Sequence, residues 1–323
     1  MYHITVLTGQ QDEDDFGERL RDIARVSYCS ETDEEMMAEQ MEDTDVIICK
    51  SETLSASLID KLDDLKLIVI LSTRSDHVDL EAARKNHVLV LNNTSYCVED
   101  IADHTCAMML ALIRQLPEYQ SDIRNNSRWQ FGSVQWPIHR VKDNLIGLVG
   151  FGHIGRAVAA RMQAFGCKIQ AYDPFASEKL MMQLRVKPVD FDKILETSDI
   201  VSLHMPLNET TQFIFQDEQF EAMKKGAMFV NCCRGGLTDE AALYHAVDDG
   251  HIRSAALDVL SMEHPGPTLL KMIARPEFLL TPRVSYHSVE ADKQVRDDAE
   301  QYIRQFFAGN YAALPVVKER ESE

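Results

Sequence analysis

Residues 145–155 read Leu-Ile-Gly-Leu-Val-Gly-Phe-Gly-His-Ile-Gly. The first five are apolar and rich in strand formers, and they lead directly into the pattern G-x-G-x-x-G, formed by Gly150, Gly152 and Gly155. The residues after Gly155 have the apolar spacing of a helix. A strand, a glycine turn and a helix in this order are typical of the unit that binds a dinucleotide.

The three glycines and a following acid have separate tasks in such a unit. Gly150 permits the tight turn, Gly152 lets the backbone approach the pyrophosphate, and Gly155 permits close packing of the helix. The N-terminus of the helix offers backbone N–H donors to the anion. A second apolar run, 168–172, leads to Asp173, whose carboxylate would accept the ribose hydroxyls and repel a 2′-phosphate. The sequence therefore predicts NAD as the cofactor, in preference to NADP.

Short apolar runs that read as buried strands recur on both sides of this unit. Polar segments with helical spacing separate most of them, which is typical of an α/β fold with parallel sheets. The predicted strands are residues 4–7, 25–29, 46–49, 67–71 and 88–91 before the glycine motif, and 200–204, 228–232, 255–259 and 278–281 after it.

Three further helices are predicted. Thr32 and Glu35 have the spacing of a capping box, which places the start of a helix there. A longer helical pattern, 98–116, ends before Pro117 and is followed by a polar stretch. A last helical pattern covers 291–307 and leads into a polar tail.

The composition limits the class of protein. With 323 residues, 45% of them apolar and 26% charged, the chain can bury substantial cores and is too apolar for a disordered protein. Its 33 Lys and Arg against 52 Asp and Glu leave a net charge of −19, which opposes binding to DNA or to an anionic membrane surface. We therefore expect neither a nucleic-acid nor a membrane partner, and an anionic substrate must meet a locally basic pocket.

Cysteine usage and the N-terminus bear on the compartment. The seven cysteines include no C-x-x-C pair and lie mostly in apolar runs, which indicates reduced, buried thiols. The first residues lack the basic and apolar segments of a secretory signal, and no run of about 18 apolar residues occurs. The sequence therefore predicts a cytoplasmic protein.

Four ordered blocks of the sequence resemble the D-isomer-specific 2-hydroxyacid dehydrogenase family. They are the glycine motif with Asp173, residues 202–211, residues 223–236 and residues 256–263. Some features are also similar to the C-terminal-binding-protein corepressors. The resemblance implies an NAD-binding Rossmann domain, 101–287, inserted into a flavodoxin-like substrate domain made of 1–100 plus 288–323. It also implies a homodimer that pairs through the nucleotide domains.

The resemblance assigns roles to single residues. Arg234 would hold the substrate, because a 2-oxo acid presents a carboxylate and a carbonyl side by side, which a planar guanidinium can bind together. Glu263 would pair with a catalytic imidazole and raise its pKa. Asp258 would contact the nicotinamide amide. The residues expected at the cofactor are Gly150, Gly152, His153, Ile154, Gly155, Asp173, His204, Pro206, Cys232 and Asp258.

One departure from the family pattern concerns the proton donor. The catalytic His of the family follows a Thr-Pro pair, but here Thr281 and Pro282 precede Arg283, which cannot donate a proton at neutral pH. His287 is the predicted replacement, on condition that the segment curls after Pro282 so that His287 approaches Glu263. The alternative is that His287 is an ordinary surface or interface residue and that proton transfer falls to water.

A second departure concerns the substrate loop, where Arg74 stands in place of a glycine of the family. Arg74 and Arg283 add two positive charges to a pocket that already has Arg234. The sequence therefore predicts a substrate with a second anionic group, contacted by Arg74, Ser75 and Arg283. The alternative is that Arg74 points to solvent or pairs with Asp76.

Two interpretations of function follow from these residues. His104 and His204 are more typical of packing or hydrogen-bonding residues than of acids, and no cluster has metal-ligand spacing. The leading interpretation is an NAD-dependent oxidoreductase that transfers hydride between nicotinamide and C2 of a small 2-hydroxy or 2-oxo acid. The competing one is a catalytically weakened NAD(H)-binding sensor or interaction protein. What distinguishes them is whether an imidazole reaches the carbonyl oxygen.

Overall fold

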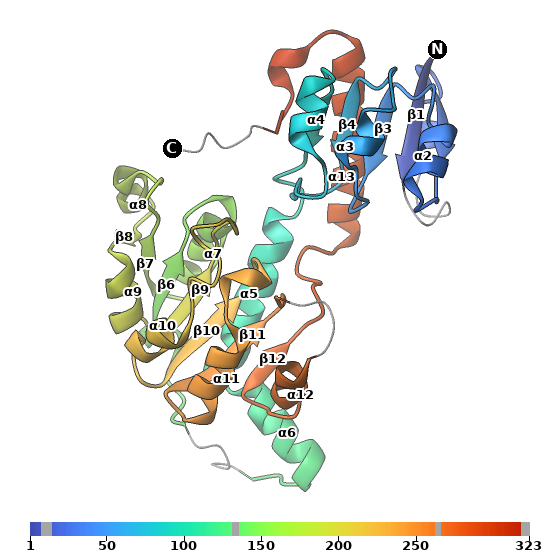
Figure 1. Cartoon of the computed structure of the whole chain (residues 1–323). Coiled ribbons are helices and arrows are strands. Elements are labelled where there is room, and N and C mark those ends of the chain that lie inside the picture. Colours follow the sequence, from blue (N-terminus) through green and yellow to red (C-terminus); the bar gives the residue numbers. More distant parts are fainter. Residues whose placement is uncertain (8–14, 131–135, 262–265, 318–323) are drawn as a thin grey trace. The chain divides into compact units, whose positions relative to one another are not determined.

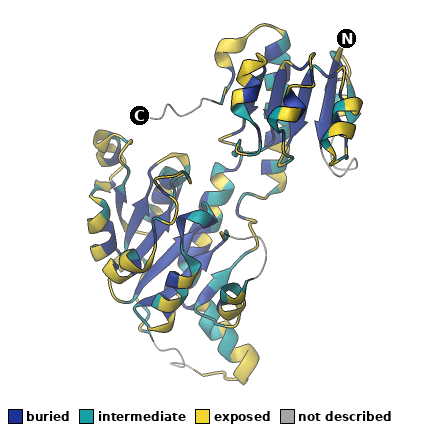
Figure 2. Cartoon of the chain, in the orientation of Figure 1, coloured by how far each residue is buried: buried dark blue, intermediate teal, exposed yellow. Residues whose placement is uncertain are grey.

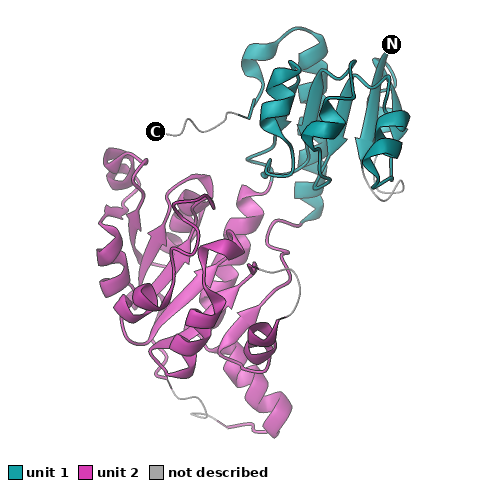
Figure 3. Cartoon of the chain, in the orientation of Figure 1, with its two compact units in different colours: residues 1–96, 288–323 teal, residues 97–287 magenta. Residues whose placement is uncertain are grey.

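The chain divides into two compact units (Figure 3). Unit 1 comprises Met1–Tyr96 and Ser288–Glu323, and unit 2 comprises Cys97–His287. In both units the strands are buried and the outward faces of the helices are exposed (Figure 2). The computed structural model describes all residues except 8–14, 131–135, 262–265 and 318–323.

Unit 1 is built around a five-stranded parallel sheet (Figure 1). Its elements are β1 (Tyr2–Leu7), α1 (Phe16–Arg19), β2 (Ala24–Tyr28), α2 (Glu34–Gln40), β3 (Val46–Cys49), α3 (Ala56–Ile59), β4 (Leu67–Ile70), α4 (Leu80–Lys85), β5 (Leu89–Asn92), α13 (Val289–Phe307) and η4 (Tyr311–Ala313). The strand order β2-β1-β3-β4-β5 is the flavodoxin-like order. Alternate strand residues point into two separate apolar cores, and α13 contributes Val295 and Ile303 to one of them.

Unit 2 contains a seven-stranded parallel sheet. Its elements are α5 (Val98–Ile113), α6 (Leu116–Asn126), η2 (Val141–Asp143), β6 (Leu145–Val149), α7 (His153–Ala164), β7 (Lys168–Tyr172), α8 (Glu178–Gln183), β8 (Lys187–Pro188), α9 (Phe191–Thr197), β9 (Ile200–Leu203), α10 (Asp217–Ala222), β10 (Ala227–Asn231), η3 (Gly235–Leu237), α11 (Glu240–Asp248), β11 (Ile252–Leu257), α12 (Pro267–Ile273) and β12 (Phe278–Leu280).

The strand order of unit 2 locates its ligand edge. The order is β12-β11-β10-β9-β6-β7-β8, so the sheet grows to one side of β6 through β7 and to the other side through β9. This is the Rossmann order with one additional strand, and such sheets bind ligands outside the carboxyl ends of the strands at the switch point. The predicted fold class, a Rossmann-type domain together with a flavodoxin-like one, is confirmed.

Some details of the predicted elements are wrong. α2 begins after Asp33, whose carboxylate accepts two backbone N–H groups of the first turn, so Asp33 rather than Thr32 is the N-cap. A second helix, α6, follows α5 where a polar stretch is predicted. At Gln115, which has a left-handed φ of 54°, the helical backbone is interrupted between α5 and α6. Pro117 fits in the first turn of α6, where its missing N–H costs nothing. β11 begins at Ile252, before the predicted start, and the two-residue β8 has no predicted counterpart.

Candidate active site at the carboxyl edge of the unit 2 sheet

The turn after β6 requires a glycine at Gly150. Its φ is 102°, a conformation that L residues rarely adopt, and a Cβ added there would lie 2.4 Å from the carbonyl O of His204. The backbone N–H of His204 donates to the carbonyl O of Val149 at 2.7 Å. The turn after β6 therefore packs tightly against the chain that leaves β9, at the switch point of the sheet.

The other two glycines of the motif have different surroundings. A Cβ on Gly155 would lie 2.5 Å from the carbonyl O of Gly150, whereas a Cβ on Gly152 would meet no described atom within 4 Å. Gly152 is also the N-cap of α7, and no side chain caps this helix. The open space at Gly152 and the uncapped backbone N–H groups at His153 and Ile154 fit the pyrophosphate of NAD.

Asp173 follows β7, and its carboxylate holds the glycine loop. Oδ2 accepts from the backbone N–H of Phe151 at 2.7 Å, and Oδ1 accepts from those of Phe175 and Ala176 at 2.9 and 3.1 Å. The side chain stays partly exposed. Asp173 thus lies beside the glycine turn, where the ribose next to a bound pyrophosphate would need an acceptor.

His204 lies directly after β9 and is not suited to be a proton donor at neutral pH. Its Nε2 is 3.0 Å from Oγ of the fully buried Ser202. Burial lowers the pKa of His204 to about 4, so its imidazole is neutral at pH 7. Pro206, two residues later, is exposed.

The chain that leaves β10 carries Cys232 and Arg234. The Cys232 thiol is buried, with its sulfur 3.5 Å from that of Met108 on α5, and burial raises its pKa to about 12. An unionised thiol of this kind is an apolar wall rather than a nucleophile. Arg234 is partly exposed, and its Nη1 donates to the carbonyl O of Cys233 at 2.7 Å.

Asn231, the last residue of β10, fixes the backbone at Arg234. Its buried Nδ2 donates to the carbonyl O of Arg234 at 2.9 Å and to Oγ1 of Thr238 at 3.1 Å. Its Oδ1 accepts from the backbone N–H of Cys233 at 2.9 Å. Asn231 is not among the predicted site residues. The sequence signal for it is a lone amide at the end of an apolar strand, directly before the Cys-Cys-Arg segment.

The segment after β12 is organised by Asp258, which follows β11. The Asp258 carboxylate is 1% exposed and accepts from Oγ1 of Thr281 at 2.6 Å and from the backbone N–H groups of Val284 and Ser285 at 2.9 and 3.0 Å. Its carbonyl O accepts from the backbone N–H of Arg283 at 2.8 Å. Arg283 has a φ of 55° and an exposed side chain. Asp258 therefore shapes the loop in which the catalytic His of the family is replaced.

The predicted proton donor, His287, lies at the end of this loop. The backbone N–H of His287 donates to the carbonyl O of Val284 at 3.0 Å, so the chain turns here, and the His287 side chain is exposed. Glu263, its predicted partner, lies outside the described residues. The pairing of His287 with Glu263 therefore stays a prediction.

A different imidazole, that of His104, lies next to Thr281 and Asp258. His104, on α5, has Nε2 3.1 Å from Oγ1 of Thr281 and 3.7 Å from Oδ1 of Asp258, and its side chain is 25% exposed. The sequence favours a hydrogen-bonding role for His104, which agrees with these contacts. No local pattern connects it to Asp258, because the contact depends on how α5 packs against the sheet.

Arg74 and Ser75 lie in unit 1, in the loop after β4. The Arg74 guanidinium donates to both carboxylate oxygens of Asp76, from Nε at 2.8 Å and also from Nη2. This pairing with Asp76 is the alternative that the sequence leaves open for Arg74. It lowers the pKa of Asp76 to about 2. The carbonyl O of Ser75 accepts from the backbone N–H of Val78 at 3.1 Å, which closes the loop before α4.

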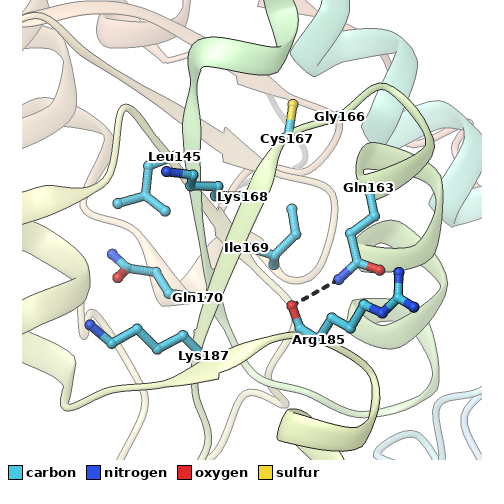
Figure 4. A pocket seen from close by; sticks show the side chains of 9 residues that line it. All are labelled: Leu145, Gln163, Gly166, Cys167, Lys168, Ile169, Gln170, Arg185 and Lys187. Atoms are coloured by element: carbon cyan, nitrogen blue, oxygen red, sulfur yellow. Dashed lines mark hydrogen bonds between the residues drawn. The ribbon is translucent and has the colours of Figure 1, made fainter.

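A cavity of about 560 Å³ lies at the opposite, amino edge of the unit 2 sheet (Figure 4). It is lined by Leu145, Gln163, Gly166, Cys167, Lys168, Ile169, Gln170, Arg185 and Lys187. No predicted site residue lines it, so it is separate from the carboxyl edge.

Among the residues that the structure describes, no group of His, Cys, Asp and Glu could hold a metal ion. No helix in the same part of the chain is long and apolar enough to cross a membrane.

The chain is similar to known dehydrogenases in sequence. It is 34% identical over 248 residues to a glycerate dehydrogenase of Methylorubrum extorquens, and the aligned region covers 76% of each chain. It is also 34% identical over 242 residues to a D-3-phosphoglycerate dehydrogenase of Bacillus subtilis, and the aligned region covers 75% of this chain and 44% of that protein.

Solved structures and a family match point the same way. The D-lactate dehydrogenase of Lactobacillus jensenii with NAD+ has a TM-score of 0.86 at 25% identity, and that of Aquifex aeolicus with NAD and lactic acid has 0.84 at 26%. Both cover 98% of this chain and 100% of theirs. Residues 106–285 match the family "D-isomer specific 2-hydroxyacid dehydrogenase, NAD binding domain". The chain therefore belongs to the D-isomer-specific 2-hydroxyacid dehydrogenase family of NAD-dependent oxidoreductases.

Proposed function

We propose that the chain transfers hydride between NAD and C2 of a small 2-hydroxy or 2-oxo acid that it binds through Arg234. The observation that carries this proposal is the position of Arg234 after β10, at the same edge of one parallel sheet as the glycine turn after β6. A guanidinium at that edge can hold the carboxylate of the acid and orient its carbonyl. NAD, when bound, accepts or supplies the hydride.

The same edge provides the groups for the cofactor. We assign the pyrophosphate to the open space at Gly152 and the first turn of α7, and the adenosine ribose to Asp173. Asp258 is assigned to the nicotinamide amide, as the resemblance implies. His204, Pro206 and the buried Cys232 are assigned to the walls of the cofactor site.

The proton of the reaction needs a donor other than Arg283. Reduction of the carbonyl adds a hydride to C2 and a proton to the oxygen, and a guanidinium keeps its proton at neutral pH. The sequence-based candidate is His287. If it is the donor, His287→Ala will lower kcat by about 10² to 10⁴-fold while NADH binding stays intact. Unchanged turnover would remove His287 from the site.

The substrate is proposed to carry a second anionic group. Arg74, Ser75 and Arg283 are its assigned contacts, and each charge-assisted contact contributes roughly 1.5 to 3 kcal/mol. The relative from Bacillus subtilis is named for a phosphorylated acid, which supports the assignment. The ion pair of Arg74 with Asp76 opposes it, because that carboxylate already offsets the charge of Arg74. If pyruvate or glyoxylate exceeds every dianionic 2-oxo acid in kcat/KM, the second anionic group is wrong.

The test of the proposed function is a panel of 2-oxo acids with NADH, followed by the absorbance of the reduced cofactor. With the best substrate, Arg234→Gln is expected to lower kcat/KM at least about 100-fold, since it removes both charge and bidentate geometry. NADH affinity, measured by fluorescence, is expected to stay unchanged. Arg185→Gln, at the opposite edge of the sheet, is the matched control and should leave both quantities unaltered.

One observation favours a second function. Arg283 at the position of the family's catalytic His is what a catalytically weakened NAD(H)-binding sensor or interaction protein would have. That protein would bind NADH and turn over no member of the panel. A wild-type chain that binds NADH and shows no turnover would therefore move the assignment to this second function.

The chain is also proposed to form a homodimer through unit 2. No residue of α6 is buried, and the exposed fractions are 57% for Leu116, 40% for Ile123 and 91% for the nearby Trp129. A partner subunit that packs against α6 would remove this apolar surface from water. Light scattering should give the mass of a dimer for the wild type and a lower mass for Ile123→Glu. A wild-type monomer would contradict the proposal.

The proposed compartment is the cytoplasm. All seven cysteines are described and none forms a disulfide, and six of them are buried. Cytosolic proteins keep their thiols reduced. Fractionation of cells that express the tagged chain would test this assignment, and recovery from a secreted or periplasmic fraction would contradict it.

A further inference from the structure

We infer that His104 is the proton donor of the reaction, in place of the histidine that the family has at position 283. This inference rests on the proposed function. His104 belongs to unit 2, where its Nε2 lies 3.1 Å from Oγ1 of Thr281 and 3.7 Å from the buried carboxylate of Asp258. An imidazole held beside a buried carboxylate has the arrangement of a general acid–base group.

The hydrogen bonds define which ring nitrogen is available. The Thr281 hydroxyl has one proton, and it donates this proton to Oδ1 of Asp258 at 2.6 Å. Its oxygen must therefore accept from Nε2–H of His104. The proton that His104 can release is then the one on Nδ1. Within the described residues Nδ1 has no hydrogen-bond partner, and the side chain is partly open to solvent.

The packing of α5 places His104 at the end of the sheet where Arg234 lies. Met108, one turn after His104 on the same face of α5, has its sulfur 3.5 Å from that of Cys232. Cys232 precedes Arg234 by two residues on the chain that leaves β10. His104 therefore lies one helical turn nearer the beginning of α5, and its neighbours Thr281 and Asp258 follow the adjacent strands β12 and β11.

The carboxylates near His104 come from α5 and from the sheet. On α5, Glu99 and Asp103 form ion pairs with Arg161 of α7, and Asp100 lies one turn before His104. On the side of the sheet, Oδ1 of the buried Asp258 lies 3.7 Å from Nε2 of His104. Asp258 is therefore the carboxylate held next to the ring.

In the direction of reduction, C2 of the 2-oxo acid takes the hydride that bound NADH would supply, and the C=O double bond becomes a C–O single bond. The carbonyl oxygen takes the Nδ1 proton of the imidazolium of His104, which becomes neutral. The products are the 2-hydroxy acid and NAD+, and His104 regains its proton from solvent. In the oxidation the neutral Nδ1 accepts the proton of the hydroxyl group.

The test compares His104→Gln with the wild type. A glutamine can still donate an N–H to Thr281, but it carries no titratable proton. We expect kcat to fall about 10² to 10⁴-fold with unchanged NADH affinity. His139→Asn, which replaces an exposed imidazole of unit 2, is the matched control and should keep wild-type turnover.

A second readout does not depend on turnover. Oxamate resembles a 2-oxo acid and cannot be reduced, so its carbonyl should accept a hydrogen bond from Nδ1–H of the imidazolium, which keeps its proton. In alkaline, weakly buffered dye solution, formation of the enzyme–NADH–oxamate complex should take up a proton. His104→Gln should lose this uptake and His287→Ala should keep it. Uptake that persists in His104→Gln and disappears in His287→Ala would overturn the inference.

The hydroxyl that connects His104 to Asp258 provides a rescue experiment. Thr281→Val removes the hydrogen bond and should lower kcat, whereas Thr281→Ser keeps the hydroxyl and should restore it. The proposed function and the role of His104 can be contradicted separately. No turnover in the wild type would contradict the proposed function, whereas normal turnover in His104→Gln would contradict only the role of His104.

Discussion

At the scale of a single residue, we assign two roles to Asp173: its carboxylate would repel a 2′-phosphate, and it holds the glycine loop through three backbone N–H groups. Two like charges about 4 Å apart at an effective dielectric of about 20 repel by roughly 4 kcal/mol. We therefore expect the wild type to bind NADH well and NADPH poorly. Asp173→Ser should bring the two dissociation constants together, as measured by cofactor fluorescence.

The loop contacts make a second outcome measurable in the same variant. Asp173→Ser should also weaken NADH binding, since Phe151 loses the acceptor that positions its N–H. Asp192→Asn, an acid in the first turn of α9, is the control for loss of one negative charge. If the wild type binds both cofactors equally, Asp173 does not select between them.

Gly152 and Gly155 are expected to respond differently to the same substitution. A Cβ on Gly152 meets open space, so Gly152→Ala should unfold at the wild-type temperature while NADH binds at least about tenfold more weakly. A Cβ on Gly155 lies 2.5 Å from a backbone oxygen, so Gly155→Ala should cost about 1 to 3 kcal/mol of stability. Thermal melts with and without NADH distinguish the two. Normal NADH affinity in Gly152→Ala would contradict the placement of the pyrophosphate.

At the scale of elements, Glu118 makes the first turn of α6 sensitive to pH. Its Oε2 is buried without a hydrogen-bond partner among the described residues, and burial raises the pKa of Glu118 to about 7. The folded state therefore holds a proton that the unfolded state releases near pH 4.5. The stability of the fold should fall as pH rises from about 4.5 to 7, and the loss should then level off.

Glu118→Gln should remove this loss. Relative to the wild type it should gain about 2 kcal/mol at pH 8 and little at pH 4.5, after allowance for the partial exposure of the side chain. Urea unfolding at a series of pH values measures the difference. Glu178→Gln, an exposed glutamate in the first turn of α8, is the control. A difference from wild type that does not change with pH would show that burial of Glu118 is not the cause.

The elements also show what sequence reasoning can reach. The strand before the glycine turn, the helix after it and the acid at Asp173 are local patterns, and each lies where predicted. The sequence does not predict α6, because Pro117 is typical of the end of a helix in a linear pattern, although proline also fits the first turn of a helix. The cluster of His104 with Asp258 could not be foreseen. Its members lie on α5 and after β11, and only the packing of the sheet brings them together.

At the scale of the whole molecule, the seven-stranded sheet of unit 2 is made entirely from one continuous segment, Cys97–His287. A segment with its own cores and no missing strand should fold alone. We therefore expect residues 97–287 to give a cooperative thermal transition and to bind NADH with the affinity of the full chain. Circular dichroism and cofactor fluorescence measure both properties. A segment that stays unfolded would show that unit 2 depends on unit 1.

Unit 1, by contrast, is made from the two ends of the chain, and this imposes an order on its folding during synthesis. The ribosome releases the first ninety-six residues well before α13, and domains fold as their chains emerge. Until α13 arrives, the sheet face that carries Ile4 and Val69 lacks the apolar cover given by Val295 and Ile303. Unit 2 can therefore mature first on the ribosome. Until α13 is translated, the exposed apolar face of the unit 1 sheet is a site at which nascent chains can aggregate.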